Sequence, residues 1–250
     1  MTEREGFLDR GDGERLAWKA LDGDGPTIVW LGGYRSDMAG SKAEALAAAA
    51  GERGWSFLRF DYFAHGRSSG RWEDATIGRW RADALAVVDE LTEGPLLLVG
   101  SSMGGWMACL TALARPERVR AMVLIAPAPD FTDLLMRPKL EPEALRELEQ
   151  NGVWMAPSFE RPPYALTRRF LDEGGDHNVL TGRVAISCPV RILQGQRDVD
   201  VPWEHALMLA NQLESEDVEL TLVKAGDHRL SGEADLARLV RTVAALRQGR

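Results

Sequence analysis

Short apolar runs alternate along the chain with longer segments whose apolar residues recur at helical spacing. Near-continuous hydrophobicity over four to eight residues is typical of a parallel strand in a sheet that is covered on both faces. The predicted strands are 27–31, 55–60, 96–99, 119–126, 190–193 and 218–223. The predicted helices are 41–53, 77–93, 106–115, 203–213 and 233–247. This alternation predicts an α/β fold with right-handed crossovers and a doubly wound, mostly parallel sheet.

Two segments depart from the alternation. Residues 15–21 alternate partly between polar and apolar and lead into the turn sequence of residues 22–26, so we expect an antiparallel edge strand. Residues 127–189 hold eight prolines and no convincing strand, and they are longer than an ordinary connection. We interpret residues 127–189 as an inserted cap with a helix at 143–150. The length of 250 residues suits one α/β domain spanning residues 1–250.

The cap segment carries loosely spaced apolar side chains that admit two interpretations. They line a pocket for an acyl chain, or they attach the cap to the sheet domain, which is the commoner role for any single residue. The residues are Leu134, Leu135, Met136, Trp154, Met155, Phe159, Tyr164 and Phe170.

A serine lies at the junction between the predicted strand 96–99 and the helix that follows. It is Ser102, within Gly100-Ser101-Ser102-Met103-Gly104. Glycines two residues before and two after a nucleophilic serine permit the sharp strand-to-helix turn called a nucleophile elbow. The turn places the hydroxyl at the positive end of the helix, where an oxyanion is stabilised. Ser102 is therefore the candidate nucleophile of an acyl-transfer hydrolase.

A serine nucleophile needs a base and an acid that orients the base, and in doubly wound sheets both lie just after strands. Asp198 follows the strand 190–193 and is the candidate acid. Asp200 is the alternative acid, but it lies beside the start of a helix, where a carboxylate more often stabilises the helix. His228 follows the strand 218–223 and is the candidate base. The chain order Ser, Asp, His is that of the α/β-hydrolases.

Backbone amides must also stabilise the oxyanion of the tetrahedral intermediate. The residue after the nucleophile supplies one donor, Met103, and the loop after strand 27–31 supplies the second. Within Gly32-Gly33-Tyr34 we expect the amide of Tyr34 to be this donor, with Gly33 as the alternative. Two further residues near these loops have structural interpretations: His65 as a residue that stabilises its turn, and Trp106 as either pocket wall or core.

Composition narrows the partners and the compartment. The net charge is −8, and no cluster of basic residues is present, so we expect no nucleic-acid partner. The sequence contains no stretch of 18 apolar residues, so no membrane span is predicted. The two cysteines, Cys109 and Cys188, fit neither a disulfide framework nor zinc spacing, and the acidic start resembles no targeting segment. We therefore expect a cytoplasmic protein without metal or cofactor.

At these residues the chain resembles the α/β-hydrolase superfamily, and within it the acyl-protein thioesterases and acyl-glucuronide esterases of animal mitochondria. The matching stretches are 33–34, 59–62, 100–102, 104–106, 114–117, 152–154, 188–189, 201–203 and 227–229. The resemblance implies an α/β-hydrolase fold with a small cap and a triad of Ser102, Asp198 and His228. The spacing from Asp198 to Val201-Pro202 is common in the family and favours Asp198 over Asp200.

The resemblance implies a serine hydrolase that cleaves thioesters or carboxylic esters of small molecules or acylated proteins through an acyl-enzyme. Other enzymatic interpretations are a general carboxylesterase or lactonase, a C–C bond hydrolase and a serine peptidase. A noncatalytic ligand-binding homologue on the same fold is an interpretation from a different class. The oligomeric state is not predicted.

Overall fold

Eight strands form one sheet in the computed structural model, which describes residues 2–157 and 162–249. The order is β1-β2-β4-β3-β5-β6-β9-β10. The bounds are β1 (Arg4–Asp9), β2 (Arg15–Leu21), β3 (Asp24–Leu31), β4 (Trp55–Phe60), β5 (Leu96–Ser101), β6 (Val119–Ile125), β9 (Val190–Gly195) and β10 (Val218–Val223). β2 pairs antiparallel with β1 and β4, and β3, β4, β5, β6, β9 and β10 pair in parallel. The predicted mostly parallel sheet is confirmed.

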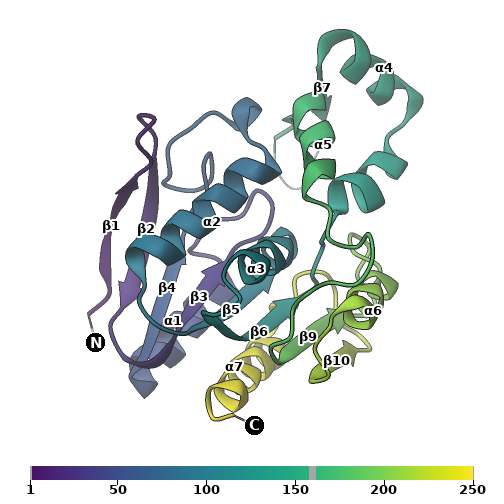
Figure 1. Ribbon diagram of the computed structural model, residues 1–250. Helices are drawn as coiled ribbons and strands as arrows, with labels where there is room; N and C mark the ends of the chain where they lie inside the picture. Colours follow the sequence, from purple (N-terminus) through teal and green to yellow (C-terminus); the bar gives the residue numbers. More distant parts are fainter. Residues whose placement is uncertain (1, 158–161, 250) are drawn as a thin grey trace.

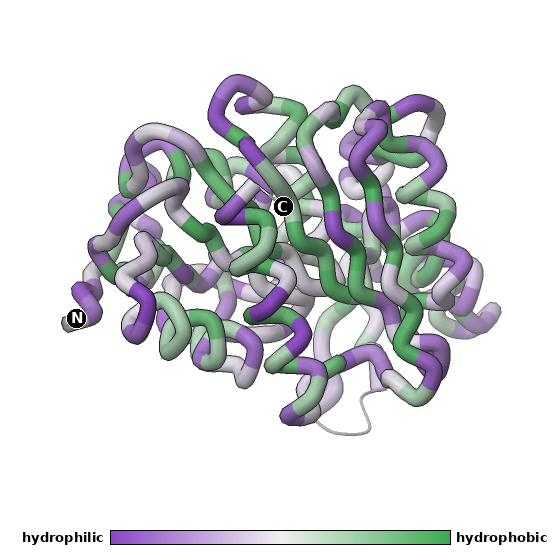
Figure 2. Tube along the Cα trace, turned by 90° about the horizontal axis from the view of Figure 1, so that it is seen from below, coloured by the Kyte–Doolittle hydropathy of each residue, from purple (hydrophilic) through white to green (hydrophobic). Residues whose placement is uncertain are grey.

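Helices cover both faces of the sheet (Figure 1). They are α1 (Ser41–Arg53), α2 (Ile77–Leu91), α3 (Met103–Ala114), α6 (Trp203–Gln212) and α7 (Glu233–Arg247). Alternate side chains of a strand point to opposite faces, so Ile28 and Trp30 pack with α1 and α7, whereas Val29 and Leu31 pack with α2, α3 and α6. The two resulting cores explain why the strands read as continuous apolar runs. Figure 2 shows the strands side by side as a mostly hydrophobic centre.

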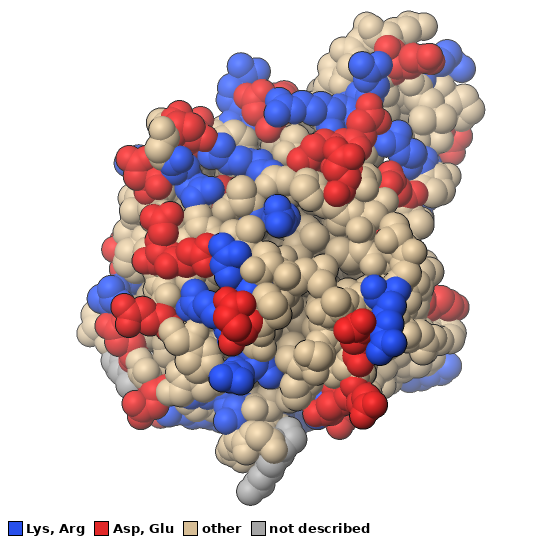
Figure 3. Space-filling view, viewed as in Figure 1, with Lys and Arg blue, Asp and Glu red and all other residues tan. Residues whose placement is uncertain are grey.

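After β6 the chain leaves the sheet, and the described residues between 132 and 174 form a lobe on one side of the molecule (Figure 1). The lobe contains α4 (Pro142–Asn151), β7 (Val153–Ala156), β8 (Tyr164–Thr167) and α5 (Arg168–Gly174). Pro142 begins α4, and Gly152 in the left-handed conformation ends it. In Figure 3 the lobe stands out at the upper right, with acidic and basic side chains interspersed on its surface. Phe170 is buried in the hydrophobic cluster that covers one face of the sheet, so the cap packs directly on the sheet domain.

One expectation about the elements is wrong, and one strand was not predicted. The cap does hold strands, because β7 and β8 pair antiparallel over four residues each, a length too short for a periodic pattern to reveal. The hydrophobic pattern does not predict β1, because only Leu8 of this strand is buried. Its polar residues are tolerated because β1 is an edge strand. In the described residues, no helix combines the length and the apolar character needed to cross a bilayer.

Candidate active site

Ser102 occupies a sharp turn between β5 and α3. Its backbone has φ 55° and ψ −120°, a strained conformation for a residue with a side chain. The helix begins at Met103, three residues earlier than the sequence pattern predicts, so Ser102 is its N-cap residue. A Cβ on Gly100 would lie 2.3 Å from the carbonyl oxygen of Gly104, and one on Gly104 would lie 1.9 Å from that of Leu31. Both glycines are therefore required by close backbone packing at the elbow.

The structure brings the three predicted triad residues into one hydrogen-bonded chain. His228 Nε2 lies 3.1 Å from Ser102 Oγ, and His228 Nδ1 lies 2.7 Å from Asp198 Oδ2. Because the carboxylate can only accept, Nδ1 carries the proton and Nε2 is left to accept from the serine hydroxyl. This is the tautomer in which histidine acts as the base toward serine.

The carboxylate of Asp198 is fully buried and accepts four hydrogen bonds. Its Oδ2 accepts from His228 and from Gln194 Nε2 at 3.1 Å. Its Oδ1 accepts from the backbone N–H groups of Asp200 at 2.9 Å and Val201 at 2.8 Å. Burial raises the pKa of Asp198, but the hydrogen bond and charge of His228, together with the two amides, outweigh burial and hold the pKa below its ordinary value. The acid is thus kept ionised opposite the imidazole.

The loop after β3 lies against the elbow. A Cβ on Gly33 would lie 3.3 Å from the carbonyl oxygen of Ser101 and 3.5 Å from Ser102 Cβ, so only a small residue permits this approach. In the described part of the chain, the structure gives the amides of Tyr34 and Met103 no hydrogen-bond acceptor. The two predicted oxyanion donors therefore lie on segments adjacent to Ser102 with their N–H groups unused.

The ring of Tyr34 is packed within a cluster of aromatic side chains. Its centroid lies 5.1 Å from that of Trp72, 5.9 Å from Trp80, 5.6 Å from Phe131 and 5.6 Å from Phe170. Burial raises the pKa of the Tyr34 phenol well above its ordinary value, so the phenol is neutral. Because Phe131 and Phe170 come from the cap segment, the cap immobilises the loop that carries the predicted oxyanion donor.

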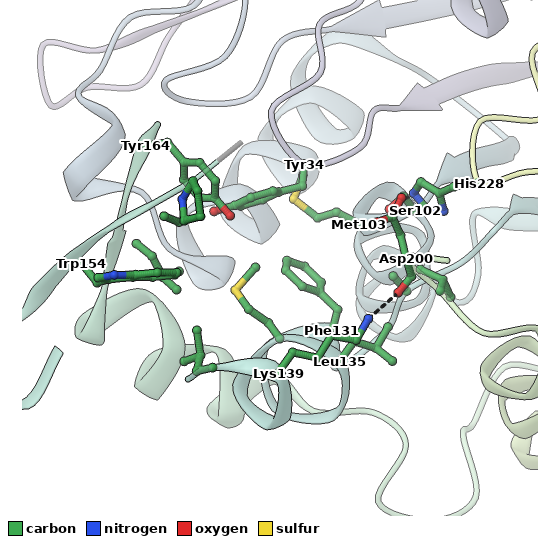
Figure 4. A pocket seen from close by; sticks show the side chains of 17 residues that line it. Tyr34, Ser102, Met103, Phe131, Leu135, Lys139, Trp154, Tyr164, Asp200 and His228 are labelled. Atoms are coloured by element: carbon green, nitrogen blue, oxygen red, sulfur yellow. Dashed lines mark hydrogen bonds between the residues drawn. The ribbon is translucent and has the colours of Figure 1, made fainter. Parts of the chain in front are cut away.

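A cavity of about 470 Å³ opens onto Ser102 and His228 (Figure 4), within the range of small-molecule sites. Four of the predicted acyl-pocket residues line it: Leu135, Met136, Trp154 and Tyr164. Among the remaining four, Leu134 and Met155 are exposed, Phe170 belongs to the aromatic cluster, and Phe159 lies outside the described residues. The apolar lining therefore comes in large part from the cap.

Other lining residues and one triad contact escaped the sequence analysis. Phe131, Leu140 and Leu166 complete the apolar wall, and Lys139 Nζ donates to the carbonyl oxygen of Asp200 at 3.4 Å (Figure 4). Gln194, the unpredicted partner of Asp198, is fully buried at the end of β9. A glutamine directly after the apolar residues Ile192 and Leu193 of this strand was the available signal, because a buried amide needs a partner.

The alternatives that the sequence left open are resolved by contacts. Asp200 lines the cavity but makes no hydrogen bond to His228 within the described residues, so its carboxylate is not the orienting acid. His65 is buried, receives the N–H of Arg35 on Nε2 at 3.1 Å, and contacts the Phe63 carbonyl through Nδ1 at 3.0 Å, which makes it structural. Trp106 is fully buried and donates to the carbonyl of His177, so it is core.

One group of side chains in the described residues is close enough to hold a metal ion. It consists of Asp198, Asp200 and His228, whose potential ligand atoms lie within 4.8 Å of one another. Metal ligation through His228 Nδ1 would require removal of the proton that this atom shares with Asp198. The arrangement therefore suits a catalytic triad better than a metal centre.

Comparison with known proteins agrees with this geometry. The family described as alpha/beta hydrolase fold matches residues 31–159, more than half of the chain. The chain belongs to this family, and with its Ser-His-Asp arrangement it is a serine hydrolase.

Specific relatives cover almost the whole chain. Mouse palmitoyl-protein thioesterase ABHD10, a mitochondrial protein, is 40% identical over 243 residues, which cover 95% of this chain and 80% of the relative. Human ABHD10 is 40% identical over 95% of this chain and 78% of its own length. Among solved structures, a putative hydrolase from Agrobacterium vitis S4 superposes with a TM-score of 0.94 at 40% identity and covers 98% of this chain and 99% of that one. The structure of mouse ABHD10 superposes with a TM-score of 0.90 at 37% identity and likewise covers 98% of this chain and 99% of its own.

These relatives contradict one expectation. Composition predicts a cytoplasmic protein, but the ABHD10 proteins that match 95% of the chain are named as mitochondrial. The prediction is wrong because it used cysteine count and the composition of the first residues, and neither property of a folded domain specifies the compartment.

Proposed function

We propose that this protein is an acyl-protein thioesterase that hydrolyses fatty S-acyl thioesters through an acyl-enzyme on Ser102. The observation that carries the proposal is the apolar cavity of about 470 Å³ that opens directly onto the Ser102–His228 pair. An acyl chain buried there would hold its carbonyl carbon at the nucleophile. The relatives named palmitoyl-protein thioesterase support the thioester as the bond cleaved.

The reaction begins with His228 Nε2 taking the proton of Ser102 as Oγ attacks the acyl carbonyl carbon. Asp198 holds the imidazole in the required tautomer and stabilises the imidazolium. The amides of Tyr34 and Met103 donate to the oxyanion of the tetrahedral intermediate. The C–S bond then breaks, the thiol leaves with the proton from His228, and Ser102 carries the acyl group.

Water completes the reaction. His228 takes a proton from a water molecule as the water oxygen attacks the acyl-enzyme carbonyl, and it returns that proton to Ser102 Oγ when the C–O bond breaks. The products are a fatty acid and the free enzyme. A thiolate needs less protonation on leaving than an alkoxide does, so a thioester places the smaller demand on His228.

Labelling by a fluorophosphonate probe tests whether Ser102 is the nucleophile. We expect labelling of the wild type and none of Ser102→Ala. Equal labelling of both proteins would overturn the assignment, and absence of labelling in both would favour a ligand-binding homologue.

Matched palmitoyl, octanoyl and acetyl substrates, each as a thioester and an oxygen ester, then test the substrate class. We expect the highest kcat/KM for a long-chain thioester. A preference for short oxygen esters without thioesterase activity would instead identify a general carboxylesterase.

A further inference from the structure

A second cavity also opens onto the active site, and none of the described residues that line it belongs to the cap segment. It has a volume of about 300 Å³ and shares Tyr34, Ser102 and His228 with the apolar cavity. Its other walls come from the loop after β3, the start of α1 and the loop after His228. Ser102 therefore stands between two cavities, as an acyl-transfer site requires if the acyl chain and the leaving group bind on different sides of the scissile bond.

The second cavity differs from the first in its chemistry. Its lining includes three serine hydroxyls besides Ser101 and Ser102, those of Ser36, Ser41 and Ser231, and two cationic side chains, Lys42 and Arg229. No aspartate or glutamate is among the described residues that line it. The apolar cavity is instead walled mostly by aromatic and aliphatic side chains, and its lining includes one basic and one acidic residue, Lys139 and Asp200. The polar cavity thus suits a group that carries negative charge.

Two carboxylates that do not line the cavity, those of Asp227 and Asp235, are near enough to Lys42 to affect its pKa, and both have other partners. Asp227 accepts the backbone N–H groups of Arg229 at 3.1 Å and Leu230 at 2.9 Å. Asp235 pairs with Arg238 at 2.6 Å. Both acids raise the pKa of Lys42, but burial, together with the charge of Arg229, lowers it overall. A bound anion would oppose that burial penalty and favour the charged ammonium.

The position of Lys42 is unfavourable for the helix that carries it. Lys42 is the second residue of α1, where the helix dipole favours acidic side chains and disfavours basic ones. Its Nζ donates to the carbonyl oxygen of Arg229, on the loop that follows His228. An ammonium has three N–H donors, so this contact orients the side chain beside the triad and uses one of them. Helix stability does not explain this lysine, whereas recognition of an anion does.

Resting on the proposed function, we propose that the polar cavity is the leaving-group subsite and that Lys42 recognises a carboxylate or phosphate on the departing thiol. The acyl chain occupies the apolar cavity, the carbonyl lies at Ser102, and the sulfur side projects toward Lys42. The subsite selects among substrates with the same acyl chain by the charge of the leaving group. Acidic residues near an acylated cysteine and a phosphate-bearing carrier thiol share this chemistry.

Paired substrates that differ only in charge test the proposal. The S-octanoyl thioesters of 3-mercaptopropionate and 3-mercaptopropionamide form the carboxylate pair, and those of phosphopantetheine and pantetheine form the phosphate pair. We expect the wild type to prefer the anionic member by about fivefold in kcat/KM, the scale of a partly exposed ion pair. Added salt should reduce the preference. The pair with the larger ratio identifies the anion.

Three variants separate recognition from a merely structural role. Lys42→Met should abolish the preference by lowering kcat/KM about fivefold more for the anionic substrates than for the neutral ones, whereas Lys42→Arg should retain most of the preference. Lys224→Met is the matched control: it removes the same charge from an exposed position between β10 and His228 that lines neither cavity. This control should keep the wild-type ratio.

Equal use of charged and neutral substrates by the wild type would overturn the proposal. An equal loss of kcat/KM for the charged and the neutral substrate in Lys42→Met would also overturn it, because that result means that Lys42 only holds the loop after His228 through Arg229. Hydrolysis of the neutral thioesters reports on the proposed function separately. If no thioester is hydrolysed, the subsite is tested by protection of Ser102 from the fluorophosphonate probe. Protection by free 3-mercaptopropionate but not by its amide, lost in Lys42→Met, would still support the subsite. Absence of this protection in the wild type would refute the subsite.

Discussion

Replacing Asp198 with asparagine perturbs the triad while keeping its shape. Two backbone N–H groups, from Asp200 and Val201, point at Oδ1, so the asparagine carbonyl oxygen is held there. The amide NH₂ must then occupy the position of Oδ2, facing His228 Nδ1. A donor at that position forces Nδ1 to accept, which moves the imidazole proton to Nε2. The histidine can then no longer take the proton of Ser102.

The size of the effect follows from this tautomer change. Loss of the correct tautomer typically lowers turnover by about 10⁴-fold, which corresponds to about 5.5 kcal/mol of activation free energy. The fold should persist, because the bonds at Oδ1 remain. The new amide also faces Gln194 Nε2, which lies 3.1 Å from Oδ2 in the native protein, so some stability is lost through two opposed donors.

The assay is kcat on a chromogenic thioester, with thermal unfolding to verify folding. Asp200→Asn is the control, because its carboxylate lines the cavity without bonding His228. We expect it to lower kcat about fivefold or less, the scale of an exposed charge. Comparable losses in the two variants, or a folded Asp198→Asn enzyme that retains a tenth of its turnover, would refute the reasoning.

Three further predictions concern residues of the scaffold. Gly104→Ala should lower stability by about 1–3 kcal/mol in urea unfolding, because its Cβ would lie 1.9 Å from the Leu31 carbonyl oxygen, whereas Gly182→Ala meets nothing within 4 Å and should be neutral. Tyr34→Ala should lower kcat about 10²-fold by releasing the oxyanion loop, whereas Tyr34→Phe keeps the ring and should change kcat little. Burial raises the pKa of Asp83 to about 6, so the folded protein keeps the proton of this carboxyl to a higher pH than the unfolded chain does. The contribution of this carboxyl to the stability of the fold is therefore lost as pH rises from about 4 to about 7. Over that range the unfolding free energy of the wild type should fall relative to Asp83→Asn by up to about 3 kcal/mol.

Each of these expectations has a contrary result. Equal stability of the two glycine variants would mean that the elbow tolerates a side chain. Full turnover in Tyr34→Ala would show that the aromatic cluster does not position the oxyanion donor. A stability difference between wild type and Asp83→Asn that is independent of pH would show that Asp83 stays ionised in the folded protein.

Local patterns predicted the sheet apart from its edge strand β1, most helices and the strand-to-helix turn that carries Ser102. Apolar runs identify parallel strands because both faces of this sheet are covered, and the glycines around Ser102 identify the elbow because backbone crowding there excludes a Cβ. The order of Ser102, Asp198 and His228 could also be read from the chain, since each follows a strand. These are properties of neighbouring residues and of the family pattern.

The tertiary structure alone decided which groups meet. Ser102 and His228 are 126 residues apart, and their 3.1 Å contact depends on the alignment of strands that no local pattern specifies. The same alignment joins Gln194 to Asp198 and surrounds Tyr34 with aromatic rings from the cap. The division of the site into an apolar and a polar cavity likewise arises only when separate loops converge. Sequence determined the chemistry that is available at each strand end, and packing determined which of those groups lie close enough to act together.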